Sequence, residues 1–304
     1  MSVSASVFSS TVTRGEDGAL SVGGRDVREL AGEYGTPLYV VDEEDMRARA
    51  AAFRDEFATA FGRHGAKVDV FYASKAFLSS KVSRWMRAED LGLDVASGGE
   101  LELALRGGMP ADRIALHGNN KSDDELRRAL EAGIARIVVD SFTEIETLDA
   151  IAREMGTTAP VMVRITTGVH AGGHEYIATS HEDQKFGISL ASGAAVEALV
   201  ACHDAPGLEL LGIHTHIGSQ ILSLEAFQES AERMLGLRAT VLAEYGIDMP
   251  EVDLGGGYAI RYTPHGEALP AHDAAYGMAD AVAAAMDKVG GGWPRFSIEP
   301  GRAI

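Results

Sequence analysis

The sequence has a single cysteine and few basic residues. Cys202 has no partner for an intrachain disulfide, which is typical of proteins in a reducing compartment. The 27 lysines and arginines are outnumbered by 45 aspartates and glutamates, so the formal net charge is −18. This balance argues against nucleic acid or an anionic membrane as a partner, because phosphate-rich surfaces bind basic patches. It does not exclude a small anionic ligand held by a local site.

Long apolar runs are also missing. No stretch approaches the roughly 18 apolar residues that a transmembrane helix requires, and the first ten residues lack the basic start and apolar core of a signal peptide. The chain of 304 residues is 46% hydrophobic and 24% charged, which is ordinary for a globular protein. This length suffices for a single α/β barrel domain. We therefore expect a soluble cytoplasmic protein.

Short apolar runs alternate with amphipathic stretches along the chain. Ser122 and Glu125 have the spacing of a helix capping box, Gly133 ends that helix, and Ser141 and Glu144 repeat the spacing. Such alternation predicts right-handed strand–helix–strand units and a parallel sheet. The predicted strands cover residues 37–42, 70–75, 92–97, 114–118, 136–141, 161–166, 208–218, 251–257 and 296–301.

The number of strands indicates the fold class. The first predicted strand precedes a long predicted helix over residues 45–63, and eight strands follow from Phe71 onward. Eight parallel strands are the number that closes a (β/α)8 TIM-like barrel. A doubly wound open sheet is the alternative. No helix follows the eighth strand in the sequence.

Polar residues are concentrated where the predicted strands end. In a barrel, the carboxyl ends of all strands meet at one face, where barrel enzymes place their active sites. The concentration therefore predicts an active site without naming its reaction. The residues are Lys75, Asp94, Ser97, His117, Asn119, Asn120, Asp140, Arg164, His214, His216, Ser219, the Gly255–Gly257 run, Glu299 and Arg302.

Lys75 ends the apolar segment "FYASKAF". Burying its ammonium costs several kcal/mol unless the charge is paired or removed, and Schiff-base formation is one way to remove it. The alternative is a surface lysine just beyond a strand. The three glycines of "DLGGGY" leave a similar choice open, because bare backbone N–H groups can bind an anion or simply form a tight turn.

His214 and His216 are two residues apart in a predicted strand and would share one face. Such a pair could bind a metal in a barrel hydrolase, be held by hydrogen bonds, or place one ring on an aromatic cofactor. Glu100 stands three residues after Ser97, so capping of the next helix accounts for it without a catalytic role.

Several motifs occur together in one order. "FYASKAF", "DVASGGELELAL", "HGNNKSDDEL", "HEYIATSHEDQKFGI", "HIGSQI", "DLGGGY" and "EPGR" span nearly the whole chain. This set resembles the fold type III decarboxylases that depend on pyridoxal 5′-phosphate (PLP), and within them the diaminopimelate branch. The loop over residues 166–180 departs from the commoner form, in which Asn-Pro-Gly precedes a Thr-His pair.

The resemblance implies roles for four residues around the cofactor ring. Lys75 would bind PLP covalently and act in proton transfer, with Asp94 supporting it. His216 would stack on the pyridine ring, and Glu299 would contact the ring nitrogen. A carboxylate there keeps the nitrogen protonated, which strengthens the ring as an electron acceptor.

The resemblance also assigns the two ends of the ligand. Ser219, the glycine run (Gly255, Gly256 and Gly257) and the turn containing Gly301 would hold the phosphate. Arg302 would contact a substrate carboxylate. No metal is implied.

The implied activity is decarboxylation of meso-2,6-diaminopimelate to L-lysine and CO2. Another basic amino acid decarboxylase of the ornithine or arginine type, or a non-catalytic PLP-binding barrel, is the alternative. Residues 1–45 would lead into a barrel over 46–304. The family's C-terminal β-domain, with its Cys-Glu-Ser motif, has no match here, so we expect this chain alone to be poorly active and the full-length enzyme to be a homodimer.

Overall fold

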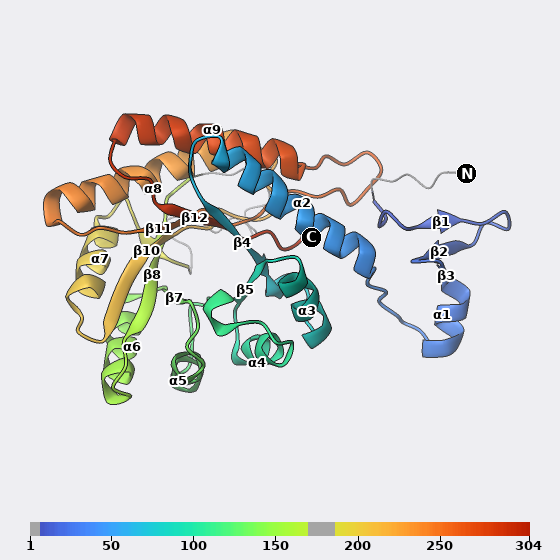
Figure 1. Cartoon of the computed structure of the whole chain (residues 1–304), viewed down its shortest axis with the longest axis horizontal. Helices are drawn as coiled ribbons and strands as arrows, with labels where there is room; N and C mark the ends of the chain where they lie inside the picture. Colours follow the sequence, from blue (N-terminus) through green and yellow to red (C-terminus); the bar gives the residue numbers. More distant parts are fainter. Residues whose placement is uncertain (1–6, 170–185) are drawn as a thin grey trace.

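Eight parallel strands form a closed barrel in the computed structural model, which describes residues 7–169 and 186–304 (Figure 1). The strands are β4 (Val68–Ala73), β5 (Gly92–Val95), β6 (Ile114–Leu116), β7 (Arg136–Val139), β8 (Ala159–Thr166), β10 (Leu208–His214), β11 (Glu251–Asp253) and β12 (Arg295–Ile298). Their order is β10–β11–β12–β4–β5–β6–β7–β8, and β8 also pairs with β10, which closes the ring. The barrel prediction is confirmed, and the open-sheet alternative is wrong.

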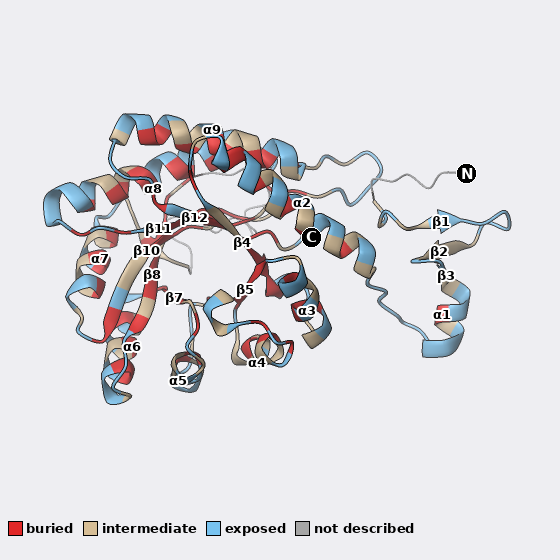
Figure 2. Ribbon diagram, in the orientation of Figure 1, coloured by how far each residue is buried: buried red, intermediate tan, exposed pale blue. Residues whose placement is uncertain are grey.

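Helices surround the strands, and the buried residues lie in the strands and on the helix faces turned toward them (Figure 2). Among the described helices, none has the length and apolarity needed to cross a membrane. The helices of the barrel are α2 (Glu43–Gly62), α3 (Ser80–Ala88), α4 (Gly98–Arg106), α5 (Asp123–Ala132), α6 (Phe142–Glu154), α7 (Ala194–Asp204), α8 (Leu224–Tyr245) and α9 (Ala271–Val289).

Helix α2 completes the barrel wall. It precedes β4 in sequence but packs against α9, β4 and α3, so it occupies the place beside β12 where a helix following that strand would lie (Figure 1). Phe53, Phe57 and Phe61 recur at helical spacing and are buried. Phe53 contacts Tyr258 at 5.3 Å between ring centroids, and Phe61 contacts Phe296 at 5.4 Å. Each buried phenylalanine contributes about 1.5–3 kcal/mol of stability.

The N-terminal segment forms a small unit beside the barrel. Strands β1 (Thr13–Arg14), β2 (Leu20–Val22) and β3 (Arg25–Asp26) pair antiparallel, and α1 (Val27–Tyr34) follows them (Figure 1). The strand predicted over residues 37–42 is wrong. These residues have no strand neighbour within the described chain, and the Tyr39 side chain is 98% exposed. Alternating apolar residues suggest a strand, but only a neighbouring strand can complete its hydrogen bonds.

The predicted helix caps are largely confirmed. Ser122 and Glu125 form a complete capping box, and Gly133 ends that helix with a φ of 68°. Ser141 accepts a hydrogen bond from the Glu144 N–H, as predicted. The Glu144 side chain, however, turns away from its own cap toward the preceding strand–helix loop.

Glu144 forms a buried ion pair with Lys121. The Lys121 ammonium also donates hydrogen bonds to the carbonyls of Gly118 (2.7 Å) and Val138 (2.8 Å), while Glu144 accepts one from the Asp140 N–H at 3.0 Å. Burial lowers the pKa of Lys121 and raises the pKa of Glu144. This pair therefore joins the loops that follow β6 and β7.

Replacing Lys121 tests the contribution of this pair. Lys121→Met leaves Glu144 buried without its cation, so we expect the free energy of unfolding to fall by about 3–5 kcal/mol in urea denaturation. Lys67→Met, at an exposed lysine, is the control and should change it by less than about 0.5 kcal/mol. Equal stability of the two variants would contradict the expectation.

Candidate active site

The barrel brings part of the predicted polar set to one pocket. A pocket of about 1290 Å³ opens where the strands end, and its walls come from several strand–helix loops. This convergence supports the position predicted from the strand ends. The predicted site residues that line the pocket are Lys75, His216, Ser219, Gly257, Glu299, Gly301 and Arg302.

Lys75 lies in a short helical turn, Ser74–Ala76, directly after β4. Its side chain is 55% exposed, toward the pocket, and its ammonium contacts Asp94 Oδ2 at 3.2 Å. Asp94, near the end of β5, is buried. The Asp94 carboxylate raises the pKa of Lys75, while burial opposes this rise. The expected support of Lys75 by Asp94 is therefore present as a direct contact.

Glu299 follows β12 and is held by two histidines. His117 Nε2 lies 2.9 Å from Glu299 Oε1, and His214 Nε2 lies 3.3 Å from Oε2. Burial alone would raise the pKa of Glu299, but the two histidines lower it well below its usual value. The carboxylate is thus kept ionised although it is only 3% exposed.

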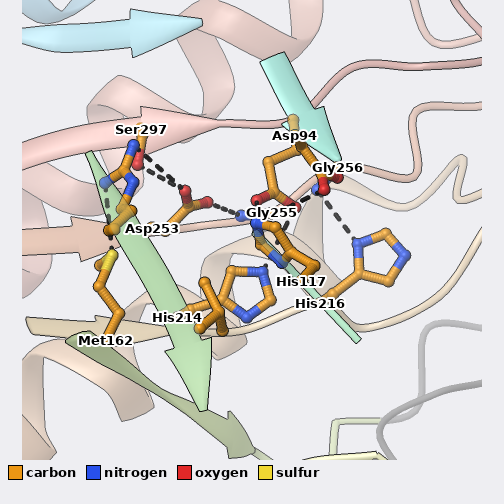
Figure 3. A network of polar contacts seen from close by, with 12 residues as sticks. Asp94, His117, Met162, His214, His216, Asp253, Gly255, Gly256 and Ser297 are labelled. Carbon is orange, nitrogen blue, oxygen red and sulfur yellow. Dashed lines mark hydrogen bonds and ion pairs between the residues drawn. The ribbon is translucent and has the colours of Figure 1, made fainter. Parts of the chain in front are cut away.

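His216 is fixed in a neutral state. Its Nδ1 accepts a hydrogen bond from the Gly256 N–H at 3.3 Å, which places any ring proton on Nε2 (Figure 3). Burial, followed by the positive charges of Lys75 and Arg164, lowers the pKa of His216 well below its usual value. A neutral, fixed imidazole in the pocket wall offers a flat surface for an aromatic ligand.

The two histidines of "HTH" do not act as a pair. Strand β10 ends at His214, so His216 lies beyond it and the argument from a shared strand face does not apply. His214 contacts Glu299, whereas His216 accepts from Gly256. The ring nitrogens thus have separate partners instead of a common centre.

The glycine run packs tightly against neighbouring backbone. A Cβ on Gly255 would lie 2.3 Å from the Thr215 carbonyl oxygen, and one on Gly257 would lie 2.2 Å from that of Gly218. Gly255 and Gly257 also have positive φ values of 70° and 105°. The Gly255 N–H donates to Asp253, at 2.8 Å.

This packing leaves fewer free N–H groups than the sequence suggests. With Gly255 bound to Asp253 and Gly256 bound to His216, only the Gly257 N–H has no hydrogen bond within the described residues. Two of the three N–H groups are therefore used within the protein. Gly257 and Ser219 remain as the pocket-lining donors for an anion.

The "EPGR" turn is joined to the lysine-bearing strand. The Pro300 carbonyl accepts a hydrogen bond from the Ala73 N–H at 3.0 Å, and a Cβ on Gly301 would lie 3.0 Å from the Ala73 Cβ. Arg302 follows, and its guanidinium contacts the Tyr262 hydroxyl and ring. The close approach fixes the distance between the two chain segments that carry Lys75 and Glu299.

Some predicted positions have structural roles. Arg164 Nε lies 3.8 Å from Asp140 Oδ1, and both residues stand outside the pocket wall. Glu100 donates its N–H to Ser97 and accepts from the Ala96 N–H at 2.7 Å, so it caps its helix as expected, although its side chain reaches Ala96 and not Ser97. The motif "HEYIATSHEDQKFGI" and the variant loop over 166–180 lie largely outside the described residues.

The sequence interpretation missed one wall of the pocket. Val7, Phe8 and residues 39–42 line it from the N-terminal segment. Asp42 accepts a hydrogen bond from the Ser9 hydroxyl at 2.6 Å, which holds the beginning of the chain against the start of α2. Local sequence patterns give no signal for such a contact, because it joins residues 33 positions apart.

The fold and the pocket define a class of protein. Residues 43–304 match the family model described as the pyridoxal binding domain of pyridoxal-dependent decarboxylases. The chain belongs to this family.

Curated relatives refine this membership. The chain is 47% identical over 302 residues, 98% of its length, to diaminopimelate decarboxylase of Mycobacterium tuberculosis. It is 42% identical over 294 residues, 97% of its length, to that of Bacillus subtilis. It spans 66% of the length of each relative. A crystal structure of diaminopimelate decarboxylase from M. jannaschii with L-lysine is similar at a TM-score of 0.86 and 32% identity, covering 98% of this chain and 68% of that one.

The pocket residues fit the family's cofactor, PLP. An aldehyde needs an amine, and Lys75 lines the pocket. A basic ring nitrogen needs a buried carboxylate, and Glu299 lines the same pocket in ionised form. A phosphate needs N–H or O–H donors, which Gly257 and Ser219 provide.

The glycine packing can be tested at Gly256. In Gly256→Ala the new Cβ would lie 1.9 Å from the Glu299 carbonyl oxygen, so we expect a loss of about 1–3 kcal/mol or more in thermal unfolding. Gly236→Ala, in α8 with open space around it, is the control and should add roughly 0.5–1 kcal/mol. Similar stabilities would show that the run tolerates side chains.

Proposed function

We propose that this chain is the cofactor-binding part of an enzyme that decarboxylates meso-2,6-diaminopimelate to L-lysine and CO2. The observation that carries the proposal is the pocket itself, in which a lysine paired with an aspartate, a buried ionised glutamate and a neutral histidine face one space. The relatives at 42–47% identity named for this activity support the choice of substrate.

Lys75 is the residue that binds the cofactor, through Nζ. Its contact with Asp94 Oδ2 orients the side chain and gives Nζ a nearby group with which to exchange a proton. When bound, PLP supplies a conjugated ring that accepts the electron pair left by the departing CO2. Lys75 Nζ is also the group placed to hold a proton for the carbon that loses the carboxylate.

Glu299 and His216 act on the ring. Glu299 is an anion fixed by His117 and His214, so it favours a proton on a ring nitrogen beside it. His216, neutral and held by the Gly256 N–H, orients the ring by stacking without adding a charge. Glu299 is buried, which excludes water and strengthens this electrostatic effect.

The ends of the ligands are assigned by the remaining groups. Ser219 and the glycine run, of which the Gly257 N–H is free within the described residues, hold the phosphate with the help of the Gly301 turn. Arg302, at the mouth beside Tyr262, binds a substrate carboxylate, since guanidinium matches carboxylate geometry. No metal is part of this assignment.

The arrangement of the protein follows the same proposal. Residues 46–304 form the cofactor-binding barrel, and residues 1–45 lead into it. Relatives are about half as long again, so we propose that the 304 residues alone turn over slowly and that the native enzyme is a cytoplasmic homodimer. An ornithine- or arginine-type decarboxylase remains the second candidate, because the family model covers several substrates.

Borohydride reduction tests the assignment of Lys75. Protein incubated with PLP, reduced and digested should give a single phosphopyridoxyl peptide, the one containing Lys75. Lys75→Ala should give none, because no other lysine among the described residues lines the pocket. Lys67→Ala, at an exposed lysine, should keep the adduct.

An adduct at another lysine would overturn the assignment of Lys75. Release of CO2 from meso-2,6-diaminopimelate by the native enzyme, with none from L-ornithine or L-arginine, would support the substrate. The reverse preference would favour the second candidate, and PLP binding without any turnover would favour a non-catalytic barrel.

A further inference from the structure

The two histidines on Glu299 come from opposite parts of the barrel. His117 follows β6, and His214 ends β10. The Nε2 atom of each histidine lies near a different oxygen of the carboxylate, at 2.9 Å for His117 and 3.3 Å for His214. A histidine nitrogen therefore lies beside each oxygen of the carboxylate.

The two rings have unequal surroundings. His117 Nε2 also lies 3.6 Å from Asp94 Oδ1, so this ring faces two buried carboxylates. His214 contacts one carboxylate, that of Glu299. The rings of His117 and His214 pack edge to face, with 4.9 Å between their centroids. A second positive charge at that distance would be strongly unfavourable in a buried site. The proton of the cluster therefore belongs on His117.

Other charged groups near the cluster agree with this distribution. Burial lowers the pKa of His117, but the carboxylates of Asp94 and Glu299 raise it above its usual value. The positive charge of Lys75 also lowers this pKa, and the two carboxylates outweigh it. Burial lowers the pKa of His214, and neither Glu299 nor Asp253 reverses this. Arg164 adds a further cation near Glu299.

We propose that His117 is the charged positioning residue of the site, which lies against Asp94 and keeps Glu299 ionised, whereas His214 is a neutral hydrogen-bond donor to Glu299. Lys75, Asp94, His117 and Glu299 then form one line of alternating charge, joined by contacts of 3.2, 3.6 and 2.9 Å. The line connects Lys75, the amine that would bind the cofactor, with Glu299, the carboxylate that would contact its ring nitrogen. This inference rests on the proposed function.

Glutamine substitutions separate charge from hydrogen bonding. A glutamine amide can place an N–H near the position of Nε2 but carries no charge. We therefore expect His117→Gln to raise the dissociation constant for PLP about tenfold or more, since a hydrogen bond to a charged group exceeds a neutral one by about that factor. His214→Gln should raise it less than about threefold. His203→Gln, exposed on α7, is the control.

A double-substitution cycle identifies the group through which His117 acts. In a Glu299→Gln background the carboxylate charge is gone, so His117→Gln should weaken PLP binding much less than in the wild type. Unfolding temperatures of the cofactor-free variants separate this coupling from a general loss of stability.

The outcomes distinguish the two proposals. Equal losses for the two glutamine variants, or an undiminished His117→Gln effect in the Glu299→Gln background, would overturn the assignment of the charge to His117. Failure of the wild-type protein to form an adduct on Lys75 after borohydride reduction would instead count against the proposed function.

Discussion

The pairing of β8 with β10 is the interaction on which the site depends. It closes the sheet into a ring, so that strand ends far apart in sequence face one another across a narrow space. Lys75 after β4, His117 after β6 and Glu299 after β12 then lie within contact distance of the same small set of groups. In an open sheet β6 and β10 would lie several strands apart, so the rings of His117 and His214 could not meet beside Glu299.

Closure of the barrel buries two carboxylates, and neighbouring basic side chains offset the electrostatic cost of burying them. Asp94 and Glu299 are almost fully buried, and a buried charge without a partner is strongly destabilising. Lys75 stands beside Asp94 and His117 stands beside Glu299, so each carboxylate has a basic group next to it. The stability of the site and its chemistry thus have the same origin, because the ionised groups that must be paired in the folded chain are those that would bind and polarise the cofactor.

Close backbone packing sets the shape of the pocket. At Gly255, Gly256 and Gly257 the neighbouring main chain comes so near that any side chain would overlap it. This brings the loop after β11 against Glu299 on one side and against the loop after β10 on the other. The run therefore contributes to the site chiefly by allowing this approach, and within the described part of the chain only the Gly257 N–H is left for an anion.

The sequence alone determined the barrel, the helix caps and the polar residues at the strand ends, several of which line the pocket. Apolar strands and Ser–Glu caps are local signals, and the shared face of a parallel barrel collects whatever polar residues end the strands. The motifs around Lys75 and Glu299 also indicated the family. Tertiary structure decided the rest. It left residues 37–42 without a strand partner, brought the N-terminal segment into the pocket wall, and gave two of the three glycine N–H groups to Asp253 and His216. It also placed His117 between Asp94 and Glu299, because contacts between residues distant in sequence depend on how the strands close in space.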